Sequence, residues 1–165
     1  MQNYTGVSAV SGGGGGIVAA PIVSAVNGVS FVDWSIPAAV RRITLDCDQV
    51  LMGIGSIAYL GTASGLVTSG YGSISAYLGS FTSYRMFSDT GLLLPETTVS
   101  NCTSRIVFDR VSDFSWACTG QSLYNSNFLS FVSGRALLPG VLTTFRVQPS
   151  GGFSAGGSMQ LLWEF

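Results

Sequence analysis

The chain contains no histidine and no lysine, and charged residues make up only 9% of its 165 residues. Without histidine, neither a Ser-His-Asp triad nor a Cys-His pair can be built from this chain. Without lysine, the run of five glycines that ends at Gly16 cannot belong to a phosphate-binding loop of the Walker type, which requires a lysine before its serine or threonine. The composition therefore excludes two widespread kinds of catalytic and nucleotide-binding site.

Charge of either sign is also scarce, with seven arginines against eight carboxylates and a net charge of −1. Such a balance gives no long-range attraction to phosphates, so we do not expect nucleic acid as a partner. The first basic residue is Arg41, so the positively charged start of a secretory signal is missing. The apolar run 17–26 is too short to span a bilayer. We therefore expect synthesis and retention in a cytoplasm, with no membrane span.

Cysteine is rare and widely spaced, at Cys47, Cys102 and Cys118. This spacing fits neither a metal-ligand pattern nor a disulfide framework. We predict buried thiols in a reducing compartment, with a single Cys102–Cys118 bridge as the alternative. We expect no metal ion and no cofactor.

Glycine, serine and threonine are abundant, which favours turns and strands over helices. Between Arg42 and Cys47 apolar and polar residues alternate, which is typical of a half-buried strand whose Ile43, Leu45 and Cys47 share one face. Similar short segments recur about every ten residues between turn signals. We predict an all-β fold, an antiparallel β-sandwich that is jelly-roll-like, over residues 29–165.

Residues 1–28 differ from the rest in their glycine content and lack of charge. Consecutive glycines lose so much entropy on ordering that they need outside contacts to hold a fixed backbone. We predict an extended glycine-rich arm that docks on a neighbouring subunit, with a flexible linker as the alternative. The side chains expected to make this contact are Ile17, Val18, Ile22, Val23 and Val26.

Two groups of carboxylates were considered for chemistry. Asp46 and Asp48 would lie on one face of a strand, about 7 Å apart, where they could bind calcium or act as an acid–base pair. The more ordinary interpretation is a strand that leaves the core into a polar loop, and we assign no catalytic residue. Asp109 and Asp113 are expected to form surface ion pairs with arginines, which contribute little energy.

Tyrosines cluster between residues 59 and 84. Exposed tyrosines suit protein interfaces and sugar binding, although half-buried positions in a sheet are the more ordinary interpretation. The candidate ligand or interface aromatics are Tyr71, Tyr77 and Tyr84.

Two segments carry a resemblance to a known family. The first is Phe31…Trp34-Ser35-Ile36-Pro37…Val40-Arg41-Arg42-Ile43-Thr44, and the second is Phe145-Arg146-Val147, a turn, then Phe153-Ser154-Ala155-Gly156 and the final Leu161-Leu162-Trp163-Glu164. Together they resemble the small β-sandwich module that recurs in tail-fibre and other virion proteins of tailed bacteriophages. The chain departs from that module at Ser154, where the family tends to carry aspartate, and at Gly157, which looks inserted.

The resemblance implies a non-enzymatic structural protein of a bacteriophage virion, made in the host bacterial cytoplasm. It would be a small surface component, of the capsid-decoration or tail-fibre type, attached through its N-terminal arm. A homotrimer is implied, with capsid or tail subunits as further partners. The alternative is a receptor- or carbohydrate-binding adhesion module of a tail fibre, with a host surface glycan as ligand.

Overall fold

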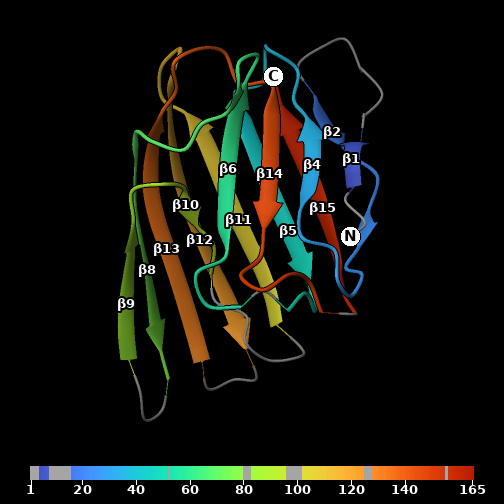
Figure 1. The fold of residues 1–165 in the computed structure, drawn as a ribbon, viewed down its shortest axis with the longest axis vertical. Helices are drawn as coiled ribbons and strands as arrows, with labels where there is room; N and C mark the ends of the chain where they lie inside the picture. The colour runs from blue at the N-terminus through green and yellow to red at the C-terminus, as the bar shows by residue number, and fades with distance from the viewer. Residues whose placement is uncertain are drawn as a thin grey trace.

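The computed structural model describes residues 4–7, 16–51, 53–79, 83–95, 102–124, 128–154 and 156–165. In these ranges the chain forms no helix, and fifteen strands build two sheets that face each other (Figure 1). The predicted all-β sandwich is confirmed. Jelly-roll connectivity stays a prediction.

The two sheets differ in size. The smaller has the order β1 (Tyr4–Val7), β4 (Val32–Ser35), β14 (Thr144–Gln148), β6 (Ile57–Thr62) and β10 (Leu92–Leu93), with β7 (Gly65–Leu66) on β6. The larger has the order β2 (Ile17–Ala19), β15 (Ser158–Glu164), β5 (Arg42–Asp48), β11 (Cys102–Arg110), β12 (Ser115–Tyr124), β13 (Phe128–Leu137), β8 (Tyr71–Leu78) and β9 (Ser83–Ser88), with β3 (Val23–Ser24) on β15. Neighbouring strands are antiparallel, except that β1 pairs with β4 in parallel.

The two segments that carry the resemblance are neighbours in both sheets. Strand β14 pairs with β4, so that Phe145 lies opposite Trp34, and β15 pairs with β5, so that Trp163 lies opposite Ile43. All four side chains are buried. Segments more than 100 residues apart therefore build the centre of the sandwich together.

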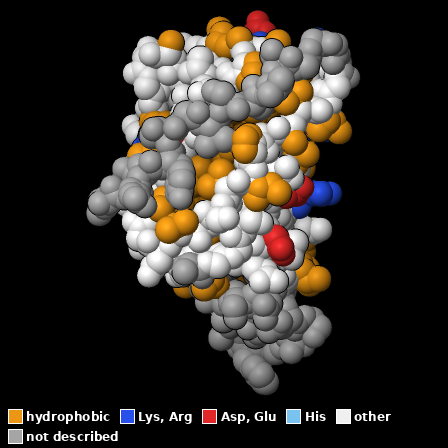
Figure 2. Space-filling view, turned by 90° about the vertical axis from the view of Figure 1, so that its right-hand side faces the viewer, with side chains coloured by type: hydrophobic (Ala, Val, Ile, Leu, Met, Phe, Trp, Pro, Cys, Tyr) orange, Lys and Arg blue, Asp and Glu red, His pale blue; other side chains and the backbone are white. Residues whose placement is uncertain are grey.

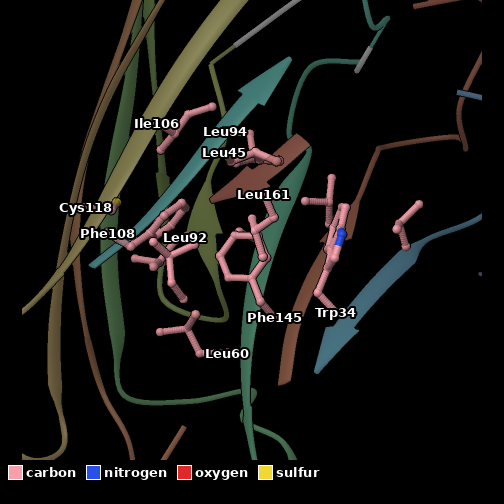
Figure 3. Packing of buried hydrophobic residues seen from close by; sticks show 14 of the residues in the cluster. Trp34, Leu45, Leu60, Leu92, Leu94, Ile106, Phe108, Cys118, Phe145 and Leu161 are labelled. Carbon is pink, nitrogen blue, oxygen red and sulfur yellow. The ribbon is translucent and has the colours of Figure 1, made fainter. Parts of the chain in front are cut away.

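The core is joined across the layers by aromatic side chains. Phe145 of the smaller sheet meets Phe108 of the larger sheet edge-on, with ring centroids 4.9 Å apart, and lies 6.2 Å from Trp34 (Figure 3). Edge-to-face contact is favourable because the positive ring edge meets the negative ring face. At one end of the larger sheet the inward positions carry hydroxyls instead. Ser104, Ser122 and Ser130 lie in register there and are buried.

The predicted N-terminal arm is not separate from the sandwich in the part that the structure describes. Strand β1 pairs with β4, and β2 and β3 pair with β15. The amide of Ala25 donates to the carbonyl of Gly157 at 3.0 Å, and the side chains of Ala20, Val23 and Ala25 are buried. The apolar residues of this segment cover the edge of the larger sheet, so a domain boundary at residue 28 must be corrected. The glycine run before Gly16 lies outside the described residues.

Candidate binding surfaces

Tyr71, a predicted ligand aromatic, is instead a structural residue. Its side chain is buried, and its hydroxyl accepts a hydrogen bond from the amide of Leu60 at 2.9 Å and donates one to the Leu60 carbonyl at 3.2 Å. Because Tyr71 is in β8 and Leu60 in β6, these bonds connect the two sheets. Desolvation raises the pKa of Tyr71 to about 12. The prediction that Tyr71 offers a free ring to a ligand is wrong.

The raised pKa of Tyr71 predicts a stability change at alkaline pH. Below pH 10 the phenol is neutral in both states; between pH 10 and 12 the unfolded chain releases the proton while the folded protein retains it. The free energy of unfolding should therefore fall as pH rises through this window. We expect Tyr71→Phe to cost about 1–2 kcal/mol at neutral pH, because Leu60 loses its partner, and to flatten the alkaline decline.

Urea unfolding of both proteins from pH 8 to 11 measures this effect. Thr143→Val, which removes a hydroxyl that donates to the Gly61 carbonyl at 3.4 Å but does not ionise in this pH range, is the control and should leave the slope unchanged. A constant difference between wild type and Tyr71→Phe across the whole pH range would contradict the assignment.

The other two candidate tyrosines form a cross-strand pair. Tyr77 in β8 lies directly opposite Tyr84 in β9. Tyr77 is half-buried, and the side chain of Tyr84 lies outside the described part of the chain. The structure thus brings these two together and separates them from Tyr71, which lies six residues before Tyr77 on the same strand.

The predicted attachment residues divide by exposure. Val23 is buried, and Val18 and Val26 pack partly against the core. Ile17 and Ile22 are 66% and 63% exposed, and the side of the sandwich that carries β1 and β2 shows few charged side chains (Figure 2). Of the five predicted residues, Ile17 and Ile22 have most of their apolar surface available for a partner.

Of the two candidate catalytic carboxylates, Asp46 takes part in a surface ion pair. Asp46 binds Arg105 through two hydrogen bonds of 2.7 and 2.9 Å. Asp109 pairs with Arg42 at 2.6 Å, and Asp113 pairs with Arg110 at 3.0 Å, as expected for surface arginines. Asp48 is exposed. The described residues hold no group of three or more side chains suited to a metal ion.

Two of the cysteines are buried thiols, as predicted. Cys47 and Cys118 are 1% exposed, and burial raises the pKa of the Cys118 thiol to about 12. Cys102 lies opposite Tyr124 and Cys118 opposite Phe108, so the backbones of the two cysteines are about 20 Å apart along the β11–β12 pair. That separation excludes the alternative Cys102–Cys118 bridge.

A half-buried ion pair fastens β4 to β14. The guanidinium of Arg146 donates two hydrogen bonds of 2.6 Å to Asp33, and its central carbon lies 3.6 Å from the centroid of the Phe31 ring. The two charged side chains are 19% and 14% exposed, so water screens them little. Planar stacking and a bidentate carboxylate are contacts that arginine makes and lysine does not.

Breaking this pair should cost more than breaking an exposed one. We expect Asp33→Asn to lower the free energy of unfolding by about 2 kcal/mol, because Arg146 keeps its charge in a half-buried place without a carboxylate. In a double-mutant cycle with Arg146→Met, the double variant should lose about 1–2 kcal/mol less unfolding free energy than the sum of the two single losses. The matched control is Asp113 with Arg110, where Asp113 is 86% exposed and the coupling should stay under about 0.5 kcal/mol. Equal coupling energies for the two pairs, measured by urea unfolding, would refute this argument.

A groove lies on the outer face of the larger sheet, over β13, β8 and β9. It has a volume of about 820 Å³ and is lined by Gly72, Ser73, Ile74, Phe87, Ser88, Asp89, Ser133, Gly134 and Arg135. Ser133, Ile74 and Phe87 lie side by side across the three strands, and Arg135 lies beside Gly72. Sequence reasoning did not single out this groove. The alternation around Phe87 placed that residue on one face, but only strand register brings it beside β13.

No family model and no curated protein matches this chain. Among solved structures, it is similar to the crystal structure of a protein of unknown function from Shewanella oneidensis MR-1. The identity is 8%, the TM-score is 0.28, and the match covers 94% of this chain and 73% of the other. A likeness this low carries no argument about fold or function. Within the described residues, no helix is long and apolar enough to cross a membrane.

Proposed function

We propose that this chain is a non-enzymatic structural protein of a tailed-bacteriophage virion, a small surface component of the capsid-decoration or tail-fibre type. The observation that carries the proposal is the adjacency of the two segments that resemble a virion β-sandwich module. Residues of both segments, among them Trp34, Phe145 and Trp163, are buried in one core. The residues that carry the resemblance are therefore among those that build the core of the sandwich.

The surface chemistry supports an assembly role. Charged residues make up 9% of the chain, and four of its seven arginines, Arg42, Arg105, Arg110 and Arg146, already pair with carboxylates. A surface of hydroxyls and scattered apolar side chains loses less solvation energy than a charged surface when neighbours cover it. We propose a homotrimer that contacts capsid or tail subunits, with neither nucleic acid nor a membrane as partner.

Attachment through the N-terminal region is proposed in a revised form. Because residues 16–28 are part of the sandwich, the contact would be made by Ile17 and Ile22 on its surface. Both are aliphatic and more than half exposed, and burying them against a neighbour would stabilise the assembly by about 25 cal/mol per Å² of apolar area, before association costs. Several copies held in one trimer would raise the effective concentration of each contact.

The test is made on particles of the phage that encodes this chain. Mass spectrometry and cryo-electron microscopy of purified particles should show the protein in a fixed copy number at symmetry-related positions. The double variant Ile17→Ser, Ile22→Ser should fold normally and lose most of its incorporation. Val111→Ser, which removes a 67% exposed apolar side chain elsewhere, is the matched control and should incorporate normally. Absence of the protein from purified particles would refute the virion role, and normal incorporation of the double variant would refute this attachment site.

A further inference from the structure

At the base of the groove over β13, β8 and β9 lies a glycine, Gly72, and the space above it is empty. Gly72 faces outward from β8, and a Cβ added there would meet no atom within 4 Å. Ser133, which lies diagonally beside Gly72 on β13, is small, whereas Arg135 lies directly opposite Gly72 on the same strand. One wall is the ring of Phe87, which is 75% exposed. The hollow therefore combines a flat aromatic surface with an open floor.

Two opposite charges line this hollow without neutralising each other. Arg135 lies on β13, and Asp89 directly follows β9, so the two residues flank Gly72 on opposite sides. Their backbones are two strand spacings apart, about 10 Å. Neither takes part in an ion pair among the described residues, whereas Arg42, Arg105, Arg110 and Arg146 do. The groove thus offers a hydrogen-bond donor on one side and an acceptor on the other.

The turn that presents Asp89 is held in place from beneath. The hydroxyl of Ser73, on the inner face of β8, donates to the carbonyl of Gly91 and accepts from the amide of Leu93, both at 3.0 Å. The amide of Thr90 donates to the hydroxyl of Ser88 at 3.3 Å. Groups whose positions are fixed before binding lose less entropy when a ligand arrives.

We propose that this groove binds a neutral saccharide. The apolar face of a sugar ring would stack on Phe87, its hydroxyls would donate to Asp89 and accept from Arg135, and the ring would fill the space above Gly72. A carboxylated sugar is disfavoured because Asp89 would offset the attraction of Arg135, while the carboxylate would still lose hydration. An apolar partner would bury Arg135 and Asp89 without pairing them, which is costly.

The experiment is a titration of the purified chain with methyl glycosides of glucose, galactose, mannose and N-acetylglucosamine, followed by the backbone amide signals in NMR. Methyl glucuronide is the anionic comparison. At about 10 mM, at least one neutral glycoside should shift the amides of Gly72, Ile74, Ser133 and Arg135, and methyl glucuronide should shift them less. Phe87→Ala and Arg135→Ala should each weaken binding about tenfold. Gly72→Leu should abolish it by filling the floor.

Leu123→Ala, which truncates an exposed side chain on the same sheet face outside the groove, is the matched control and should bind normally. If Gly72→Leu does not fold, Phe87→Ala and Arg135→Ala still decide whether the groove binds the glycoside. Lack of any shift with all four neutral glycosides, or unchanged affinity in both Phe87→Ala and Arg135→Ala, would overturn the proposal. Groove shifts that follow protein concentration and not glycoside would identify an interface between copies, and would overturn it as well. The inference goes beyond the virion role, and because purified chain is used, its failure leaves that role untouched.

Discussion

Replacing Gly157 by alanine should lower the free energy of unfolding by at least about 3 kcal/mol, or prevent folding altogether. Gly157 has a φ of +81°, a conformation that costs a residue with a side chain about 1–2 kcal/mol. A Cβ there would also lie closer than 3.0 Å to the backbone of Asp48 and Gln49. Backbone atoms cannot move aside as the end of a flexible side chain can, so the β5 end and the β15 start would have to separate.

Gly151 provides a matched control for this prediction. Its φ is +82°, nearly the same as at Gly157, but an added Cβ would meet nothing within 4 Å. Gly151→Ala should therefore show the conformational cost alone, about 1 kcal/mol. Urea unfolding of the two variants separates strain from collision, and similar losses at both positions would rule out the collision at Gly157.

Truncation of Phe145 should be about as damaging. Its ring is fully buried between Trp34 and Phe108 and links the two sheets, so Phe145→Ala removes contacts on both sides and leaves a cavity. We expect a loss of about 4 kcal/mol. Phe145→Leu keeps most of the volume and should lose about 1–1.5 kcal/mol.

Phe87→Ala is the second control, since Phe87 is 75% exposed and its truncation should change stability by less than about 0.5 kcal/mol. Midpoints of thermal or urea unfolding measure all three variants. A small loss for Phe145→Ala would mean that the two layers close over the gap, and that the core does not depend on this ring.

Strands with a clear alternation could be predicted from the sequence. Ile43, Leu45 and Cys47 were expected on one face of a strand, and all three are buried in β5. A one-residue shift would have moved them to the outer face, so the buried core fixes their orientation. Pro37 was expected before this strand, and it precedes β5.

The long meander of β12 and β13 was not predicted at its full length. Gly120 and Gly134 lie inside β12 and β13, although glycine weakens strand interiors. In the structure both face inward, where a Cβ would collide with Ile106 at Gly120 and with Ser73 at Gly134. Glycine is present because neighbours on other strands occupy its space, and no local pattern contains that information.

In the candidate sites, too, the features that were not predicted depend on contacts with distant strands. Tyr71 was a candidate for contact with a ligand, but its hydroxyl meets the backbone of Leu60 on the opposite sheet. Ile17 and Val23 belong to one apolar run, yet pairing with β15 exposes the first and buries the second. Burial of a residue depends on which distant strand it meets, so composition alone could not separate these residues.

The pairing of early strands with late ones sets an order of events during synthesis. Strand β5 ends at Asp48, but its partner β15 begins at Ser158, about 110 residues later. At roughly 5–20 residues per second, the ribosome needs roughly 5–20 seconds to supply that partner. During this time the edges of β4 and β5 that pair with β14 and β15 have no partner, and the sandwich cannot close. Such long-range pairing also slows folding itself, typically to milliseconds or seconds. The nascent chain therefore depends on its sparse charges, and on whatever chaperones the cell provides, to stay apart from its own copies until the last strand emerges.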